Sequence, residues 1–322
     1  MRSSLGACPV PSIARVRPGD LVSLRVRDAA GPRDVVGELV AATPTTVSVR
    51  RRDGSLEQIA VDDVEAGRVV PPGPERTISV TELQRIAATG WRAPTIEPLG
   101  EWLLRAADDI TGRANSALPL GDPGMPLGEA IHAVRRWYAD RGLPPRFQTP
   151  IGHIDPDLEA RLDAASWAAG PPVHLMTAAL GPVLRRRGAD ESQVELDEAP
   201  DDAWLELWRA SAEKEAARRL ATNHERAIFA SVRDAGEVVA TARASVDGRW
   251  AGLFCVAVAP SSRRHGLGRA VSIAALRWAV SVGARFSYLQ TEAGNEPAIS
   301  LYSGLGYRAH HDYRYRTATI PS

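Results

Sequence analysis

The stretch VAVAPSSRRHGLGR, residues 256–269, carries the residues of this chain best suited to bind a phosphate group. An apolar strand ends in it and an amphipathic helix begins in it. The first N–H groups of a helix have no intrahelical acceptor and lie at the positive end of the helix dipole. Gly266 and Gly268 would let a phosphate approach this backbone closely, and Arg263 and Arg264 could add charge-assisted contacts. The pattern therefore predicts a pyrophosphate site.

Two familiar nucleotide-binding motifs are excluded by the same residues. A P-loop requires GxxxxGK[ST], which the sequence lacks. A Rossmann fingerprint requires GxGxxG, and this chain has Val271 at the third glycine position. What remains is RxxGxG directly after an apolar strand. Taken alone, that pattern is better explained by a surface loop whose glycines only begin a helix, so its meaning depends on the residues that follow.

The residues downstream complete a family pattern. Asn295, Ala298 and Tyr302 are followed by GLGY at residues 304–307. Together with RxxGxG they resemble the GNAT superfamily of N-acetyltransferases, over residues 190–316. The whole chain resembles actinobacterial GNAT proteins that have an SH3-like N-terminal domain and a degenerate first GNAT half, and the run TGRANSALPLGDPG supports that likeness.

The resemblance implies an acetyl-CoA site and no metal. The amides of Val256 and Val258 would pair with the pantetheine arm as an added strand does, and the loop 263–269 would hold the pyrophosphate. Asn295 would contact the coenzyme, and Tyr302 would protonate the departing thiolate. The residues that the resemblance assigns to coenzyme binding are Val256, Ala257, Val258, Arg263, Arg264, His265, Gly266, Leu267, Gly268, Arg269, Asn295 and Ala298.

The spacing within the last helix agrees with these roles. Asn295 and Tyr302 are seven residues apart, about two helical turns, so they share one helix face. Ala298 lies between them and is small enough to leave room for a ligand. A phenol with an ordinary pKa near ~10 suits proton donation to a thiolate. The alternative is that Tyr302 binds or packs without acting as the acid. His265 is expected to offer only its backbone.

An acetyl transfer to an amine also needs a base and an oxyanion contact. An ammonium group with a pKa near ~10 must lose a proton before its nitrogen can attack a thioester. Glu292, on the strand beside the presumed split between the two central strands, is the first candidate for the base, and Glu225 is the second. A strand amide such as that of Val256 would stabilise the tetrahedral oxyanion.

Other conspicuous residues have structural explanations. Cys255 follows Phe254 in an alternating apolar strand, so a buried core thiol is favoured over a nucleophile. Arg113 and Asn115 could face an acceptor cleft, but a satisfied pair at a strand end is the preferred interpretation. Core positions at helical spacing are Trp204, Leu207, Trp208 and Leu220.

The elements that position these residues follow from apolar patterning and breaker residues. Residues 16–72 contain five short β-rich runs and predict a small SH3-like β-barrel, followed by a stiff linker, VPPGPER, at 70–76. Residues 190–322 predict the order β-α-β-β-β-α-β-α-β. Between these regions, strands are expected at 101–108, 112–120, 145–151 and 172–180, and helices at 80–88, 126–142 and 155–167. The first two helices after residue 190 are expected at 201–220 and 266–282.

The region after the barrel shows an internal repeat when short gaps are allowed. Trp137 aligns with Trp278, which favours a tandem of two related α/β units. Leu162 takes the place of Tyr302, and GDPGMPLG stands where RRHGLG would be expected, without its arginines. The first unit is therefore expected to be a scaffold and not a second active site.

Composition bounds the class of protein. The chain has 322 residues and a formal net charge of +0, which gives no global attraction to nucleic acid or to an acidic membrane. Cys8 and Cys255 form no CxxC pair, which fits a reducing, cytoplasmic location. No apolar run reaches the ~18 residues of a membrane span.

The expected fold class is α/β (α+β), a tandem GNAT fold with a mixed central sheet. Three domains are predicted: an SH3-like β-barrel at 1–73, a degenerate GNAT-like domain at 74–187, and an acetyl-CoA-binding GNAT domain at 188–322. The barrel could serve to reach a protein partner.

The expected function is transfer of an acetyl group from acetyl-CoA to a primary amine by direct attack, with Tyr302 as general acid. One alternative is a sensor or regulator that binds acetyl-CoA without turnover. Another is a binding scaffold in which the GNAT unit is only structural. An intact Tyr302 and RxxGxG favour the enzyme. In the first unit, which is expected to be inactive, the position of Tyr302 is taken by Leu162.

Overall fold

The computed structural model describes residues 20–28, 31–51, 55–70, 77–185, 190–209 and 213–318. These form two compact units, Met1–Thr77 and Ile78–Ser322. Cys8 and residues 71–76 of the predicted linker lie outside the described residues. None of the helices in the described ranges is long and apolar enough to cross a membrane.

The first unit is an antiparallel sheet in the order β4-β3-β2-β1-β5. The five strands were predicted, but their closure into a barrel was wrong. The two outer strands, β4 and β5, form no ladder with each other in the described part of this unit. β5 has no fully buried side chain, and only its half-buried Val64 packs against the core that a closed barrel would enclose. The strands are β1 Leu21–Val26, β2 Arg33–Ala42, β3 Thr46–Arg51, β4 Leu56–Ala60 and β5 Val64–Val69.

The second unit is built on a mixed sheet in the order β11-β12-β13-β14-β15-β10-β16-β8, with β9 paired to β16. β14 and β15 are parallel, and the neighbouring pairs are antiparallel. β6 and β7 form a separate hairpin. The strands are β6 Thr95–Leu99, β7 Trp102–Ala106, β8 Arg146–Pro150, β9 Ala168–Ala169, β10 Val173–Ala179, β11 Val194–Asp197, β12 Ala227–Asp234, β13 Glu237–Asp247, β14 Trp250–Val258, β15 Phe286–Glu292 and β16 Arg308–Thr317.

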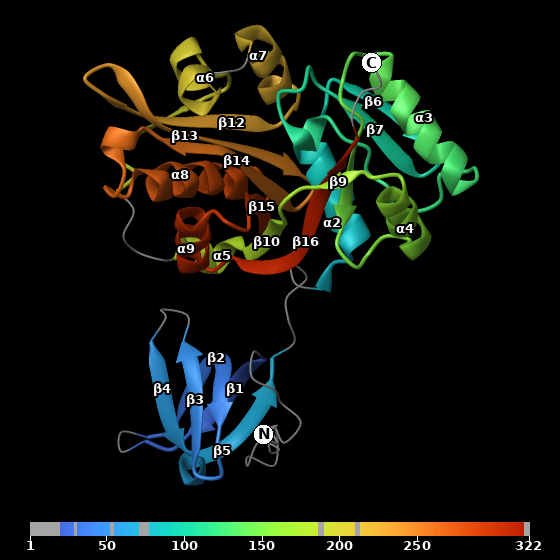
Figure 1. The fold of residues 1–322 in the computed structure, drawn as a ribbon. Coiled ribbons are helices and arrows are strands. Elements are labelled where there is room, and N and C mark those ends of the chain that lie inside the picture. The colour runs from blue at the N-terminus through green and yellow to red at the C-terminus, as the bar shows by residue number, and fades with distance from the viewer. Residues whose placement is uncertain are drawn as a thin grey trace. The chain divides into compact units, whose positions relative to one another are not determined.

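Helices cover both faces of this sheet (Figure 1). One hydrophobic cluster joins the sheet to α5, α8 and α9. A second cluster joins the opposite face to α2, α6 and α7. A third packs α3 and α4 around β7 and β8. The helices are α2 Val80–Gly90, α3 Leu127–Ala139, α4 Pro156–Ala164, α5 Leu180–Leu184, α6 Asp202–Arg209, α7 Lys214–Thr222, α8 Leu267–Ser281 and α9 Glu296–Leu305.

The predicted order of elements after residue 190 is confirmed, with one helix divided in two. The single helix expected over 201–220 is wrong, because α6 ends at Arg209 and α7 begins at Lys214. The Glu213 carboxylate accepts from the backbone N–H groups of Glu215 and Ala216, at 3.0 and 2.7 Å, and so begins a new helix. Trp204 and Leu220 are buried, as expected of core positions.

The strand expected over 112–120 is also wrong. Gly112–Ala114 is a 3₁₀ turn, η3, and the rest makes only isolated bridges at Ala117 and Leu118. The segment is buried from Ala114 to Leu120, which explains why its apolar pattern is typical of a strand.

β10 lies between two strands that come much later in the chain. All of β10 pairs with β15, from Val173 opposite Glu292 to Ala179 opposite Phe286. Its other edge pairs with β16. The sheet that carries the proposed coenzyme region therefore includes a strand from before residue 188. The predicted division of the second unit at that residue stays a prediction.

A chain of buried polar side chains joins the first half of this unit to the sheet. The Arg105 guanidinium donates to Ser116 and to Oε1 of Gln148, at 3.0 Å for Gln148. The Gln148 side-chain nitrogen donates to Oε1 of Gln84 at 2.7 Å. All four residues are buried. Buried amides of this kind need partners on both ends, and these have them.

The chain continues through two histidines. The Gln84 side-chain nitrogen lies 2.8 Å from Nε2 of His311, and the Nδ1 atoms of His311 and His310 are 2.8 Å apart. His310 Nε2 is 2.9 Å from the Ile78 carbonyl, which only accepts, so it carries the proton there. His310 Nδ1 then accepts from His311, and His311 Nε2 accepts from Gln84. Every link has one donor and one acceptor when both imidazoles are neutral.

This arrangement makes the stability of the second unit depend on pH. Burial, followed by the neighbouring His310 and His153, lowers the pKa of His311 to about 4. The unfolded chain binds a proton at this histidine near pH ~6.5, and the native state does not, so the free energy of unfolding falls as the pH falls from ~6.5 to ~4. We expect a loss of about 2 kcal/mol between pH 6.5 and pH 5 from this group.

Urea unfolding followed by tryptophan fluorescence measures this directly, since all eight tryptophans lie in the second unit. His311→Gln keeps a side chain that can accept from Gln84 but cannot titrate. The variant should lose most of the pH dependence over that range. An unchanged pH profile in His311→Gln would contradict the assignment.

Candidate functional site

The candidate site begins where β14 and β15 separate. Their parallel ladder runs only from Trp250 opposite Phe286 to Leu253 opposite Leu289. Beyond Leu253, in this fully described stretch, the edge of β14 that faces β15 has no ladder partner, and β15 continues against β10 alone. The side chains change at the same place, from buried in the first half of β14 to half-buried from Cys255 to Val258. The sheet is therefore open at the strand segment predicted to bind the coenzyme.

A β-bulge at Cys255 causes the separation. Thr241 and Arg243 of β13 lie opposite Ala257 and Phe254, so two positions on β13 correspond to three on β14. Cys255 has a φ of 55°, in the left-handed region, and its carbonyl accepts from the Thr241 hydroxyl at 2.9 Å. An extra residue bends the bulged strand. Val256, Ala257 and Val258 are thereby directed away from β15.

The loop after β14 has the geometry of an anion-binding turn. Arg264 and Gly266 both have left-handed φ values, 68° and 80°, and Gly266 is the N-cap of α8 with no side-chain capping bond. The first turn of α8, which includes Leu267 and the half-buried Arg269, has no acidic residue. Such a helix start leaves N–H groups for a ligand.

The side chains of this loop are exposed and held only loosely to the fold. Arg263 Nε lies 3.3 Å from the Val258 carbonyl, and His265 Nδ1 lies 3.3 Å from the Ser262 carbonyl. The Arg263 contact reaches the end of β14, and the His265 contact stays within the loop. A Cβ placed on Gly268 would lie 3.4 Å from Val258 and 3.7 Å from Leu301, so the first turn of α8 is close to both β14 and α9.

Tyr302 lies beneath this first turn. Its side chain is 6% exposed, packs edge-on against Tyr307 at 5.8 Å, and hydrogen-bonds the Ser272 side chain. Ser272 in turn donates to the Gly268 carbonyl at 2.7 Å. Burial raises the pKa of Tyr302 above its ordinary value, and Ser272 opposes part of that shift. The phenol is therefore protonated at neutral pH. The Ser272 side chain connects it to the Gly268 carbonyl in the glycine turn.

Asn295 and Glu292 flank the start of α9. The Asn295 side-chain oxygen caps the helix by accepting from the Ala298 N–H at 3.2 Å, and its backbone N–H donates to the Glu292 carbonyl at 3.0 Å. Both side chains are exposed, and Ala298 is half-buried. Because β14 and β15 are parallel, Glu292 lies at the same end of the sheet as Val256.

The structure also bears on two other hypotheses from the sequence, Glu225 as the second candidate base and Cys255 as a core thiol. Glu225 precedes β12, whose first residue, Ala227, pairs with Ser245 near the far end of β14. It lies at the opposite end of the sheet from the bulge and is a poor candidate for the base. Burial raises the pKa of the Cys255 thiol to about 12, which agrees with a core thiol and not a nucleophile.

Arg113 and Asn115 do not form the satisfied pair that was preferred from the sequence. Asn115 is satisfied: its side-chain oxygen accepts from the N–H groups of Ala107 and Asp109, at 2.7 and 3.1 Å. Arg113 has no hydrogen bond or ion pair with any described residue. Its guanidinium lies 5.8 Å from the Trp91 ring and 5.7 Å from the Phe254 ring. Sequence reasoning missed this, because the turn that separates the two residues looked like a strand.

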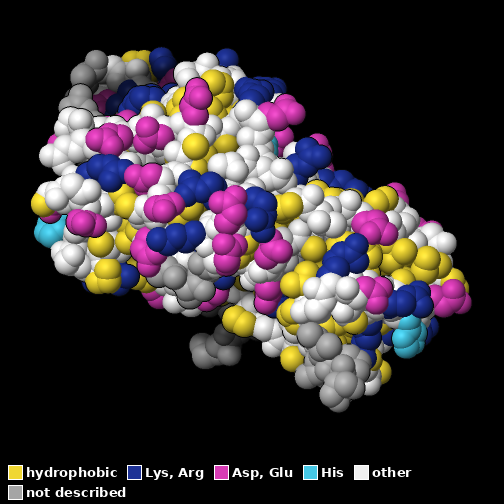
Figure 2. Space-filling view, turned by 90° about the horizontal axis from the view of Figure 1, so that it is seen from above, with side chains coloured by type: hydrophobic (Ala, Val, Ile, Leu, Met, Phe, Trp, Pro, Cys, Tyr) yellow, Lys and Arg dark blue, Asp and Glu magenta, His cyan; other side chains and the backbone are white. Residues whose placement is uncertain are grey.

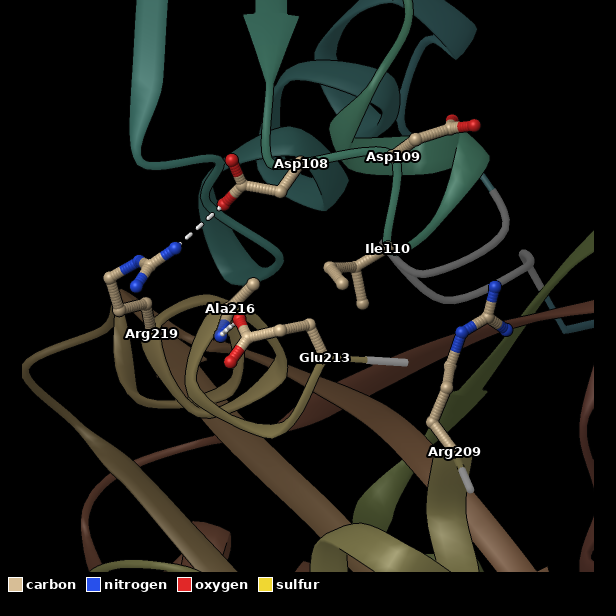
Figure 3. Close-up of a pocket in the computed structure, with 7 residues that line it drawn as sticks. All are labelled: Asp108, Asp109, Ile110, Arg209, Glu213, Ala216 and Arg219. Atoms are coloured by element: carbon tan, nitrogen blue, oxygen red, sulfur yellow. Dashed lines mark hydrogen bonds and ion pairs between the residues drawn. The ribbon is translucent and has the colours of Figure 1, made fainter. Parts of the chain in front are cut away.

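A pocket of about 430 Å³ opens beside this region (Figure 3). It lies between the loop after β7 and the helices α6 and α7. Its three carboxylates are already engaged: Asp108 with Arg219 at 3.0 Å, Asp109 with Arg146 at 3.0 Å, and Glu213 with the start of α7. The residues that line it are Asp108, Asp109, Ile110, Arg209, Glu213, Ala216 and Arg219.

The face of the molecule that Figure 2 shows, seen from above relative to Figure 1, carries charges of both signs. Dark blue and magenta side chains alternate over that face and form no broad field of one sign. The face in view therefore offers no extended basic patch of the kind that nucleic acid binding uses.

The comparisons with known proteins give a consistent picture. The family described as "Probable histone acetyltransferase Rv0428c C-terminal" matches residues 77–316. Over 316 residues the chain is 32% identical to the probable histone acetyltransferase Rv0428c of Mycobacterium tuberculosis, covering 93% of this chain and 95% of that protein. It is 28% identical over 246 residues to the uncharacterized N-acetyltransferase YobR of Bacillus subtilis, covering 74% of this chain and 98% of that protein.

A solved structure shares the fold. The GCN5-related N-acetyltransferase from Kribbella flavida superposes with a TM-score of 0.55 at 19% identity, covering 75% of this chain and 96% of that chain. The α+β architecture with a mixed sheet is thus one that acetyltransferases use.

Proposed function

Since the chain belongs to the GNAT family of acetyl-CoA-dependent N-acetyltransferases, in the group described by Rv0428c, we propose that it moves an acetyl group to a primary amine by direct attack. The observation that carries this proposal is the meeting of three features at one end of the sheet. These are the open edge of β14, the uncapped start of α8, and Tyr302 linked to that start through Ser272.

The residues present fit the shape and charge of acetyl-CoA. The edge of β14 after Leu253 can take the amide groups of a pantetheine arm as a strand would. The turn of Arg263 to Gly268 supplies N–H groups and two exposed arginines for the pyrophosphate. The Asn295 side-chain amide nitrogen, which bonds no described residue, is left to donate to the coenzyme.

The chain's own groups divide the chemistry as follows. The coenzyme supplies an activated acetyl thioester when it is bound. The Val256 N–H would donate to the carbonyl oxygen where negative charge develops during attack. Tyr302 would donate its proton to the departing sulfur, turning it away from Ser272, whose own hydroxyl proton is donated to the Gly268 carbonyl.

Glu292 is our candidate for the base that deprotonates the incoming ammonium group. It is exposed at the end of β15, on the side of the opening across from Val256. A carboxylate in this place can act through a water molecule. Its neighbour two positions earlier, Gln290, lies on the same face of the strand and accepts from the Tyr313 hydroxyl at 2.7 Å.

The coenzyme site is tested by removing its charge. We expect Arg263→Ala/Arg264→Ala to weaken acetyl-CoA binding by about tenfold to a hundredfold, because charge-assisted contacts to the pyrophosphate are lost. Isothermal titration calorimetry measures the dissociation constant. Arg277→Ala is the control: it lies on α8, the helix that follows this loop, and its guanidinium bonds Glu191. An unchanged affinity in the double variant would contradict the site.

The reaction is tested by thiol release from acetyl-CoA with a panel of amines. Release that depends on the amine supports the transferase. Binding of acetyl-CoA without release across a broad panel would support a sensor instead.

A further inference from the structure

The face of the sheet covered by α2, α6 and α7 buries positive charge without matching negative charge. Arg243 is 1% exposed, and its guanidinium donates to the carbonyls of Ala221 and Gly90 at 2.7 and 3.1 Å. Arg105, on strand β7 of the separate hairpin, is 2% exposed and donates to Ser116 and to Gln148 of the sheet. Among the described residues, no carboxylate forms an ion pair with either guanidinium. Buried charges in proteins are usually paired, and these two guanidinium groups have only neutral acceptors, so the region holds positive charge without a balancing anion.

Arg113 is the member of this set that is free to bind one. It is half-buried, and its five N–H donors have no acceptor among the described side chains and backbone groups. The rings of Trp91 and Phe254 hold its guanidinium in place. Phe254 is the residue immediately before the bulge at Cys255, so these donors lie beside the opening between β14 and β15.

The other side of Arg113 is also polar. Its turn packs against Tyr315, since a Cβ on Gly112 would lie 2.8 Å from that ring. The hydroxyls of Tyr315 and Tyr313 are 3.4 Å apart, and Tyr313 donates to Gln290 on β15. Arg113 thus lies over the sheet between β14 and β16, facing the strand that ends at the candidate base.

The carboxylates nearby cannot supply the missing charge. Asp108, Asp109 and Glu213 line the adjacent pocket, and each is bound to an arginine or to helix N–H groups. The spare binding capacity of this region is therefore for an anion. A planar, two-oxygen anion matches the fork of a guanidinium best.

We propose that Arg113 binds a carboxylate of the acceptor, so that the substrate is a small amine that also carries a carboxylate. This rests on the proposed function, and it names the substrate class for that site. The amine would reach the opening of the sheet while the carboxylate is held by Arg113 on the face under α2. A neutral or purely cationic amine would leave Arg113 unpaired and should be a poor acceptor.

The test compares acids with their amides. Thiol release is measured with the α-amino acids and with the corresponding α-amino amides. Wild type should prefer the acids by at least about tenfold in kcat/KM. Arg113→Gln should raise KM for the acids by about tenfold to a hundredfold, with the KM for acetyl-CoA and the rate with amides unchanged. Arg113→Lys should recover part of the loss.

Arg135→Gln is the matched control, because that arginine is also half-buried and stacks on a tryptophan, Trp167, at 5.1 Å, within the cluster around α3. It should leave both substrate series unchanged. Equal turnover of acids and amides by wild type, or an equal loss for both in Arg113→Gln, overturns the proposal.

A binding measurement separates this proposal from the proposed function. In the presence of coenzyme A, N-acetylamino acids should raise the unfolding temperature of wild type more than their amides do, and should not do so in Arg113→Gln. Equal stabilisation by acid and amide, or none by either, overturns the carboxylate site. Selective stabilisation without thiol release from any amine would leave the carboxylate site standing and refute the transferase.

Discussion

Tyr302→Phe should reduce kcat by about a hundredfold to a thousandfold while the dissociation constant of acetyl-CoA stays the same. The change removes one oxygen from a buried ring that keeps its packing against Tyr307. What is lost is the proton that would go to the departing sulfur, a contribution made during the reaction and not in the bound ground state. Steady-state thiol release gives kcat, and calorimetry gives the affinity.

Tyr307→Phe is the control for this variant. That phenol belongs to the same aromatic pair and is also buried, but its hydroxyl donates to Ser287 at 2.7 Å and not toward the turn before α8. Its kcat should stay within about threefold of wild type. If Tyr302→Phe retained wild-type kcat, or lost activity only as much as Tyr307→Phe, the acid would have to be another group.

Gly90→Ala should destabilise the second unit by about 3 kcal/mol. A Cβ at this last residue of α2 would lie 2.0 Å from the Tyr288 hydroxyl and 3.2 Å from the Ser245 hydroxyl. Tyr288 is fully buried, and α2 cannot shift away easily, because the Gly90 carbonyl accepts from Ser245 and Arg243 at 2.8 and 3.1 Å. Urea unfolding followed by tryptophan fluorescence measures the loss.

The collision can be relieved by a second change. Tyr288→Phe removes the oxygen that lies nearest the added Cβ, so Gly90→Ala/Tyr288→Phe should recover most of the stability lost in Gly90→Ala. Gly304→Ala, on α9, makes the same chemical change where no atom lies within 4 Å. It should be neutral or stabilise by up to about 1 kcal/mol. A Gly90→Ala protein as stable as Gly304→Ala would show that α2 moves freely.

The parts of the fold that follow from local pattern were predictable. The strand–helix–strand order predicted around the glycine turn is found as β14, α8 and β15, because strand-type runs between breaker residues mark sheet strands. The helix expected over 266–282 is found over Leu267–Ser281. The helix expected over 155–167 is found as α4, Pro156–Ala164, and the Asp155 side chain caps it.

The missed parts depend on contacts between distant residues. Nothing in the sequence around Cys255 favours a left-handed φ, and the bulge there is held by Thr241 on the neighbouring strand. The segment 112–120 has the apolar content of a strand, but it makes only isolated bridges at Ala117 and Leu118. The Asn115 side chain instead holds the preceding turn by bonding the backbone of Ala107 and Thr111. The empty donors of Arg113 could be seen only once Trp91 and Phe254 were brought around it.

The position of β10 constrains how this protein can be made and how its gene can be divided. As the ribosome releases the chain, β10 emerges roughly a hundred residues before the first of the two strands it will join, so it must remain available through much of synthesis. Dividing the gene at codon 188 would leave the downstream product without β10, the strand that pairs with both β15 and β16. Neither product would then contain the complete sheet.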